Sequence, residues 1–157
     1  MNVKNFMNTH VVTASPSATL PQIWNLINTK HLHSLPIVDK KRKLKGIIAK
    51  EDFLAKLYPD LAEGSQLPMD SDEDIHEKME KLKKLKAADI MNTAIIFTRP
   101  DTNVMRALSR MIVRNVRQLP VLDENDTTVG MISKADIFAG LFKQTSKSTV
   151  ASNKIKT

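Results

Sequence analysis

Seven consecutive residues, Gly130-Met131-Ile132-Ser133-Lys134-Ala135-Asp136, combine groups that can hold a ribonucleotide. An Asp at the start of a helix can accept hydrogen bonds from the 2′- and 3′-hydroxyls of a ribose, and its charge strengthens those bonds. A Ser three residues earlier can donate to a phosphate oxygen, while free N–H groups at the helix start face the same anion. A glycine before them lets another chain or a ring approach closely.

The spacing of Ser133 and Asp136 is also typical of a helix cap. In a capping box, the Ser side chain caps the first turn and the acidic side chain three residues later reaches back to it. This interpretation explains both residues without any ligand. The capping and binding roles can also coexist, so both remain open at this point.

The motif has an earlier twin, Gly46-Ile47-Ile48-Ala49-Lys50-Glu51-Asp52, at an offset of 84 residues (130 minus 46). In the twin, Ala49 replaces the hydroxyl, so Asp52 can hold a ribose but the phosphate donor is missing. The first site therefore either prefers a ligand without that phosphate contact or is empty. The same offset joins Met7-Asn8-Thr9 to Met91-Asn92-Thr93, Leu35-Pro36 to Leu119-Pro120, and Asp39 to Asp123, which indicates an internal duplication without a gap.

Each repeat is predicted to form β-α-β-β-α units. The strands contain neighbouring apolar residues instead of strict alternation, which indicates burial on both faces. Because the helices of one repeat can cover only one face of its sheet, we expect an α+β fold in which the two units stack as a pseudo-twofold sandwich. The expected elements are 11–13, a helix over 20–27 capped by Ser17 or Thr19, 35–38, 44–48 and a helix over 52–57, then 95–97, 104–112, 119–122, 129–132 and 136–142.

The repeats span residues 3–57 and 87–142, and two other segments accompany them. Residues 58–86 begin as an acidic linker and continue as an amphipathic helix with an apolar stripe, which we expect to dock on the module or on a second subunit. Pairs Glu77–Lys81 and Glu80–Lys84 stand at i,i+4 on this helix. Residues 143–157 lack periodicity and are predicted to be a disordered basic tail. The stripe consists of Ile75, Met79, Leu82 and Leu85.

Composition narrows the class of protein. Hydrophobic residues make up 41% of the chain, and cysteine is absent, which excludes disulfides and thiolate metal sites and fits a cytoplasmic protein. No apolar run has the length needed to span a bilayer. His31-x-His33 lacks a third ligand nearby, so we expect no metal site. The net charge of +7 favours anionic partners in general.

The repeated order of these motifs resembles a tandem pair of CBS domains. Each repeat opens near Asn-Phe-Met or Asp-Ile-Met, contains Leu-Pro-hydrophobic-hydrophobic-Asp, and closes on Gly-hydrophobic-hydrophobic-x-x-x-Asp. The resemblance implies the stacked sandwich and a module that binds adenosine-containing ligands in clefts between the repeats. It also implies dimers.

The resemblance further implies that His33 and Arg117 contact a phosphate and that Thr13 and Phe97 line a base pocket. Arg117 is the stronger phosphate candidate because it is always charged. Lys50 and Lys134 stand in a first helical turn, where a cation opposes the helix dipole and a bound phosphate would relieve this. The candidate ligand-binding residues are Gly130, Ser133, Lys134, Asp136, Arg117 and Phe97 in the second repeat, and Thr13, His33, Gly46, Lys50 and Asp52 in the first.

The expected function is a stand-alone regulatory module. It would bind AMP, ADP, ATP or S-adenosylmethionine as a regulatory ligand, require no cofactor, and signal to an unidentified protein target. No catalytic constellation is recognisable, so we expect no enzyme. The alternative is a ligand-free interaction or nucleic-acid-binding module that uses the basic turn Lys40–Lys45 and the helix segment Lys81–Lys86.

Overall fold

The computed structural model describes residues 1–58 and 72–153, with side chains as far as residue 146. The chain divides into two compact units. Unit 1 combines Met1–Val11 with Ile96–Thr157, and unit 2 is Val12–Ile95. The units therefore do not coincide with the sequence repeats, because the opening segment of each repeat belongs to the unit built mainly from the other. Within the described residues there are six α-helices and two antiparallel two-stranded sheets, which confirms the α+β class.

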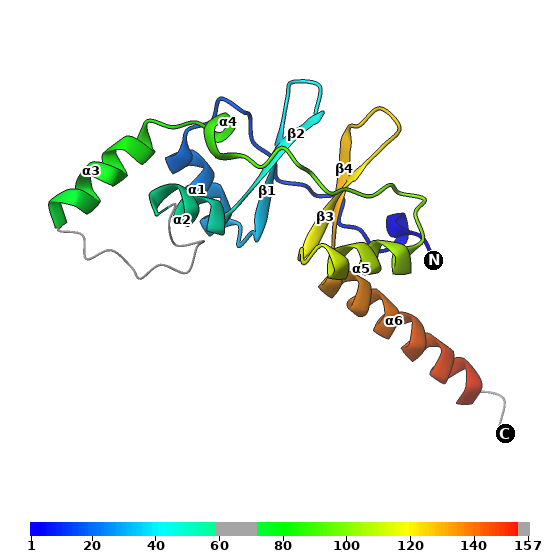
Figure 1. Ribbon diagram of the computed structural model, residues 1–157. Helices are drawn as coiled ribbons and strands as arrows, with labels where there is room; N and C mark the ends of the chain where they lie inside the picture. Colours follow the sequence, from blue (N-terminus) through cyan, green and yellow to red (C-terminus); the bar gives the residue numbers. More distant parts are fainter. Residues whose placement is uncertain (59–71, 154–157) are drawn as a thin grey trace. The chain divides into compact units, whose positions relative to one another are not determined.

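Unit 2 is a β-hairpin with helices near its open end, opposite to its turn (Figure 1). Its core is aliphatic apart from Phe53, and it includes Leu82 and Ala87 from the segment between the repeats. The elements are α1 (Leu20–Thr29), β1 (Ser34–Val38), β2 (Leu44–Ala49), α2 (Lys50–Leu57), α3 (Asp72–Lys83) and α4 (Ala87–Ile90).

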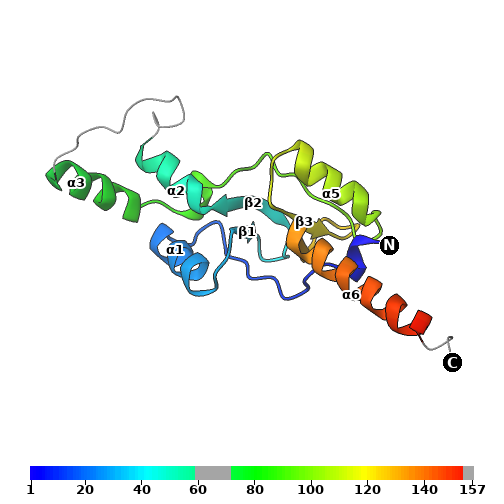
Figure 2. The same ribbon diagram turned by 90° about the horizontal axis from the view of Figure 1, so that it is seen from below.

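Unit 1 has the same hairpin-and-helix arrangement. Its N-terminal segment lies beside α5 and α6, as Figure 2 shows. Val3 and Phe6 from that segment enter the same hydrophobic cluster as Met111 and Ile137. The short helix η1 and the helix α4 of unit 2 were not expected from the sequence. The elements of unit 1 are η1 (Val3–Asn5), α5 (Val104–Val113), β3 (Gln118–Leu122), β4 (Thr128–Ser133) and α6 (Lys134–Asn153).

The first expected strand of each repeat is wrong: residues 11–13 and 95–97 form no strand. The residue after each segment makes a single parallel bridge, Ala14 with Ile37 and Thr98 with Val121. The Leu-Pro motif explains this. Pro36 accepts from the Ala14 N–H at 3.1 Å through its carbonyl, but it has no N–H to continue the ladder towards Val12.

The Met-Asn-Thr motifs pair with the closing strands within each unit. Asn8 exchanges two backbone hydrogen bonds with Met131, at 2.8 and 2.9 Å, and Asn92 does the same with Ile47, at 2.9 and 3.0 Å. The repeat that opens the chain therefore supplies an edge to β4, and the second repeat supplies an edge to β2. This pairing satisfies backbone groups that would otherwise form an open sheet edge.

Capping side chains define where the helices begin. Thr19 caps α1, since its hydroxyl accepts from the Gln22 N–H at 3.4 Å while the Gln22 side chain accepts from the Thr19 N–H at 3.0 Å. α2 and α6 begin at Lys50 and Lys134, two residues earlier than expected. The reason is that Asp52 and Asp136 occupy the third position of their helices. Each accepts a hydrogen bond from the residue just before its helix, as in a capping box.

The expected amphipathic helix forms as α3 and packs on α1 and α2. Leu82 is buried, whereas Ile75 and Met79 are 38% and 37% exposed. Glu77 pairs with Lys81 at 3.1 Å as expected, but Glu80 pairs with Lys83 at 2.9 Å and not with Lys84. On a helix both i+3 and i+4 are neighbours, so either lysine can reach. Most of the expected acidic linker, residues 59–71, lies outside the described residues.

The end of the chain differs from the expectation of disorder after Phe142, because α6 continues to Asn153. The segment contains neither Gly nor Pro after Gly140, and its hydroxyls bond to the helix backbone: Thr145 Oγ1 donates to the Leu141 carbonyl at 3.2 Å and Ser146 Oγ to the Phe142 carbonyl at 2.9 Å. Such local bonds let Ser and Thr remain in a helix. None of the helices in the described part of the chain has the length and apolar character needed to cross a membrane.

Candidate functional site

Four of the predicted site residues meet at one corner of unit 1, where β4 ends and α6 begins. Ser133 pairs with Gln118 across the hairpin, so Arg117 lies next to Lys134, and the Lys134 N–H donates to the Arg117 carbonyl at 3.3 Å. Asp136 follows in the first turn of α6 and is half-buried, as are Ser133 and Lys134. The corner therefore combines a hydroxyl, a carboxylate and two cations.

The Ser133–Asp136 pair forms the capping box that its spacing predicts. The Ser133 N–H and its Oγ both donate to Asp136 Oδ2, at 2.8 and 2.7 Å, and the Asp136 N–H donates to Ser133 Oγ at 3.0 Å. Both bonds to the carboxylate use the same oxygen. Asp136 Oδ1 accepts no hydrogen bond from the described residues, so the cap leaves one carboxylate oxygen available to a ligand.

The corresponding corner of unit 2 has half of this cap. The Ala49 N–H donates to Asp52 Oδ2 at 2.7 Å, and no hydroxyl joins them. Burial raises the pKa of the Asp52 carboxyl above its usual value of 3.8, although the Ala49 hydrogen bond acts in the opposite direction. His33 is exposed beside this corner, since Ser34 pairs with Ala49. Unit 2 therefore offers a carboxylate with one capping hydrogen bond and no hydroxyl donor.

Phe97 lies alongside β3 in unit 1 and is held by two arginines that the sequence analysis did not select. The Arg99 guanidinium stands 4.9 Å from the ring centroid, and Arg110 Nη1 donates to the Phe97 carbonyl at 2.5 Å. Arg99 in turn pairs with Asp126 at 2.8 Å and donates to the Asp123 carbonyl. The acidic turn of the second hairpin could have indicated a basic partner, because its carboxylates attract a cation. Arg99 is the residue that pairs with it.

The space beside each of the two motif glycines, where a Cβ would lie, is occupied by neighbouring residues of the same unit. A Cβ on Gly130 would lie 2.8 Å from Met7 Sδ and 3.1 Å from the Asn8 carbonyl oxygen, and one on Gly46 would lie 2.6 Å from Met91 Sδ. The close approach that the sequence predicted thus comes from the Met-Asn-Thr segments. Thr13 precedes the bridging Ala14 and is half-buried. Any contact of these residues with a ligand stays a prediction.

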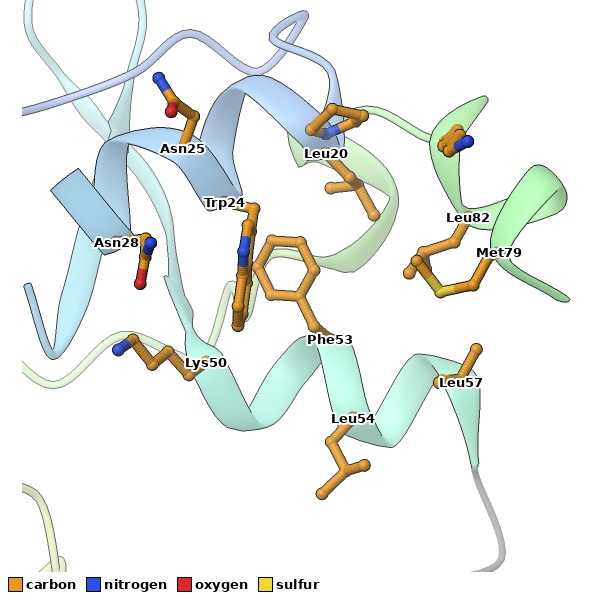
Figure 3. A pocket seen from close by; sticks show the side chains of 12 residues that line it. Leu20, Trp24, Asn25, Asn28, Lys50, Phe53, Leu54, Leu57, Met79 and Leu82 are labelled. Carbon is orange, nitrogen blue, oxygen red and sulfur yellow. The ribbon is translucent and has the colours of Figure 1, made fainter. Parts of the chain in front are cut away.

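The two motif lysines have different surroundings. Lys134 is half-buried at the unit 1 corner, whereas Lys50 is exposed. Figure 3 shows the Lys50 side chain at the edge of an apolar groove, near Asn28 and Trp24 of α1. The duplication therefore does not give the two lysines equivalent neighbours.

The basic turn of the first hairpin is an ordered, exposed tip. Asp39 accepts from the Lys41 and Lys43 N–H groups at 2.9 and 3.0 Å, and these backbone bonds, with Lys45 3.7 Å away, hold the pKa of Asp39 below its usual value. Lys40, Lys41 and Lys43 are exposed around it. In the second basic segment, Lys81 and Lys83 are paired with glutamates, which reduces its net charge.

Comparison with known proteins matches the repeats to one family. The CBS domain model matches residues 3–59 and 87–143. A CBS domain-containing protein of Dictyostelium discoideum is 32% identical over 142 residues, covering 90% of this chain and 91% of its own.

Solved structures show the same fold. CBSX2, solved in complex with AMP, has a TM-score of 0.73 and 20% identity, covering 92% of this chain and 98% of its own. A CBS domain pair solved with 5′-methylthioadenosine and S-adenosyl-L-methionine has a TM-score of 0.66 and 23% identity, covering 90% of this chain and 99% of its own. The two matched repeats and the similarity along nearly the whole chain place this protein in the CBS domain family, as a tandem CBS pair.

Proposed function

We propose that this protein is a stand-alone regulatory module that binds an adenosine-containing ligand at the Ser133–Asp136 corner of unit 1. The observation that carries the proposal is the carboxylate of Asp136, which caps α6 with Oδ2 and has Oδ1 left over. The complexes of CBSX2 with AMP and of another CBS pair with S-adenosyl-L-methionine support the ligand class.

In this proposal each residue of the corner contacts a different part of the ligand. Asp136 Oδ1 accepts from the ribose hydroxyls, and its charge makes those bonds stronger than neutral ones. The Ser133 hydroxyl donates to Asp136 Oδ2 in the cap, so on binding it turns from that bond to a phosphate or another polar 5′ group at the start of α6. Arg117 and Lys134 supply positive charge nearby. The Phe97 ring, with one face towards Arg99, offers its other face to an adenine base.

Unit 1 is the better site for a phosphorylated ligand. Unit 2 has Ala49 in place of Ser133, and an exposed His33 in place of Arg117. We therefore expect one nucleotide to bind tightly, and the unit 2 corner to stay empty or to accept a ligand without a phosphate.

Isothermal titration calorimetry with AMP, ADP, ATP and S-adenosylmethionine tests the proposal. The informative variant is Asp136→Asn, because the amide oxygen can still accept the capping bonds while the charge is lost. A hydrogen bond to a charged group contributes about 1.5–3 kcal/mol, so affinity should fall roughly ten- to a hundredfold. Asp52→Asn is the control in the other repeat.

Asp89→Asn controls for capping alone. Asp89 accepts from the Lys86 N–H at 2.7 Å in the same geometry, but it caps the short helix α4 and has no proposed ligand. Loss of binding in Asp136→Asn alone supports the site in unit 1. Unchanged affinity in that variant, or no binding of any adenosine ligand to the parent protein, would refute it.

For the response, we propose that the module forms homodimers through the α5–α6 face and presents the ligand-bound state to a protein target. Met105, Ile112 and Phe138 are 50%, 61% and 51% exposed. Their counterparts at the offset of 84 are Pro21, Asn28 and Leu54, which line one groove in unit 2. The three residues of unit 1 are therefore expected to lie on one face. Phe138→Lys should shift a dimer to monomer in analytical ultracentrifugation. A parent protein that is monomeric with and without ligand would contradict this.

The exposed basic tip around Asp39 favours one second candidate, binding to nucleic acid or another polyanion. Phosphate contacts make such binding strongly dependent on salt. Replacing Lys40, Lys41 and Lys43 with Gln should then weaken binding to a labelled oligonucleotide and flatten the salt dependence. No binding by the parent protein at low salt would remove this candidate.

A further inference from the structure

Unit 2 contains a groove that the adenosine proposal does not use. It lies between α1, α2 and α3 and has a volume of about 610 Å³, which is within the range of roughly 300–1,000 Å³ that is common for small-molecule sites. Figure 3 shows Trp24 and Phe53 in its middle and Met79 and Leu82 reaching in from α3. Eight of its twelve lining residues are apolar.

The polar residues of the groove have one sign of charge. Two lysines and two asparagines line it, and no carboxylate does. Lys83 is already paired with Glu80 at 2.9 Å. Lys50 forms no ion pair with any described residue, although it stands at the edge of an apolar surface. The groove thus offers a long apolar floor and one available cation at its edge.

The groove also has a third side, which is formed by α3. The internal duplication supplies equivalents of α1 and α2 in unit 1, whereas α3 comes from the segment between the repeats, and the described residues of unit 1 contain no equivalent of it. Met79 and Leu82 therefore turn the helix face of unit 2 into a three-sided groove. Trp24 remains 45% exposed there, and its ring meets Phe53 edge-on with centroids 5.2 Å apart.

We infer that this groove binds an amphiphilic anion of the fatty-acid type, with the acyl chain along Trp24, Phe53 and Met79 and the carboxylate beside Lys50. Burial of the chain supplies most of the binding free energy, since apolar area removed from water dominates such sites. The lysine orients the ligand, and its long stem can lie on the apolar surface while its ammonium group reaches the carboxylate.

Trp24 is the single tryptophan of the chain, so its fluorescence reports on this groove directly. The experiment titrates the full-length protein with dodecanoate below its micelle concentration. We expect a saturable blue shift as the acyl chain covers the indole. Acetate, which has the head group without the chain, should have no effect, and dodecyltrimethylammonium, which reverses the charge, should bind more weakly.

Two variants on α3 form a matched pair. Met79 lines the groove and Ile75 does not, but both are on the same helix one turn apart, with exposures of 37% and 38%. Met79→Glu places a charge against the acyl chain and should weaken dodecanoate binding at least about tenfold. Ile75→Glu should leave it unchanged. Lys50→Gln should weaken dodecanoate roughly two- to fivefold, the range for an exposed ion pair.

The outcomes separate this ligand from other occupants. The absence of a saturable shift, or equal weakening by Met79→Glu and Ile75→Glu, would overturn the inference. Trp24 emission that changes with protein concentration while dodecanoate has no effect would show that a second copy covers the groove, and would overturn it too. Adenosine-ligand calorimetry on the same samples is independent, so failure of one proposal leaves the other standing.

Discussion

Replacing Ser133 with Ala tests the cap at the proposed site. The expected structure of this variant can be read from unit 2, which already has an alanine at the equivalent position. Ala49 already occupies this position in unit 2, where the backbone N–H still donates to Asp52 Oδ2 at 2.7 Å. Ser133→Ala should therefore keep the 2.8 Å bond from its N–H to Asp136 Oδ2. It should lose the 2.7 Å bond from Oγ and the 3.0 Å bond from the Asp136 N–H.

The lost bonds set the expected magnitude. Removing a Ser cap costs about 0.5–2 kcal/mol, and the Asp136 N–H is at a helix start where water can partly replace the lost partner. We expect the free energy of unfolding to fall by about 1 kcal/mol. In a chain of this length that corresponds to a melting temperature roughly 2–4 °C lower.

The reciprocal change, Ala49→Ser, should add the same bonds in unit 2 and stabilise it by roughly 0.5–1 kcal/mol. Urea denaturation followed by circular dichroism measures both variants. Trp24 fluorescence adds a signal from unit 2 alone, because the single tryptophan lies there. Two variants that both leave stability unchanged would show that the hydroxyl contributes nothing, and the capping argument would then be wrong.

Three further changes probe other features. Thr98→Val should stabilise the protein by about 1 kcal/mol in urea denaturation, because the Thr98 hydroxyl is buried without a hydrogen-bond partner among the described residues; a loss of stability would contradict this. Gly130→Ala should cost about 1–3 kcal/mol, since its Cβ would lie 3.1 Å from the Asn8 carbonyl oxygen, which cannot rotate away; a neutral result would show that the Asn8 segment can move. Burial raises the pKa of Asp52, so the folded state favours the protonated carboxyl. The contribution of the protonated carboxyl to the free energy of unfolding is present below pH 3.8 and is lost as the pH rises through the raised pKa. Asp52→Asn should therefore gain stability relative to the parent protein as the pH rises from about 3 to about 7, measured by Trp24 fluorescence in urea; a difference independent of pH would contradict the burial argument.

The duplication made much of the fold predictable from the sequence. Helical periodicity located α1, α3 and α5, and the Ser133-x-x-Asp136 spacing predicted a cap that the structure confirms. The same spacing could not decide whether Asp136 has spare capacity, because this depends on which carboxylate oxygen accepts the capping bonds. That information lies in side-chain geometry.

Other features depended on contacts between distant segments. Residues 11–13 do not form the expected strand because Pro36, on the neighbouring strand β1, has no N–H to continue the ladder. A local sequence pattern does not show which residue lies opposite. Arg99 was missed because its partner, Asp126, is 27 residues away. The extension of α6 to Asn153 also exceeded the expectation, since a polar composition does not exclude a helix when its hydroxyls bond to the backbone.

The exchange of opening segments between the repeats has a consequence for the order of folding during synthesis. Unit 2 is complete once residue 95 has left the ribosome, but Asn8 must wait for its partner Met131, which is synthesised 123 residues later (131 minus 8). Contacts of such long range are formed slowly. Until then Val3 and Phe6 have no core to enter, so the nascent chain exposes these apolar residues. A truncated product ending after the first repeat would keep them exposed.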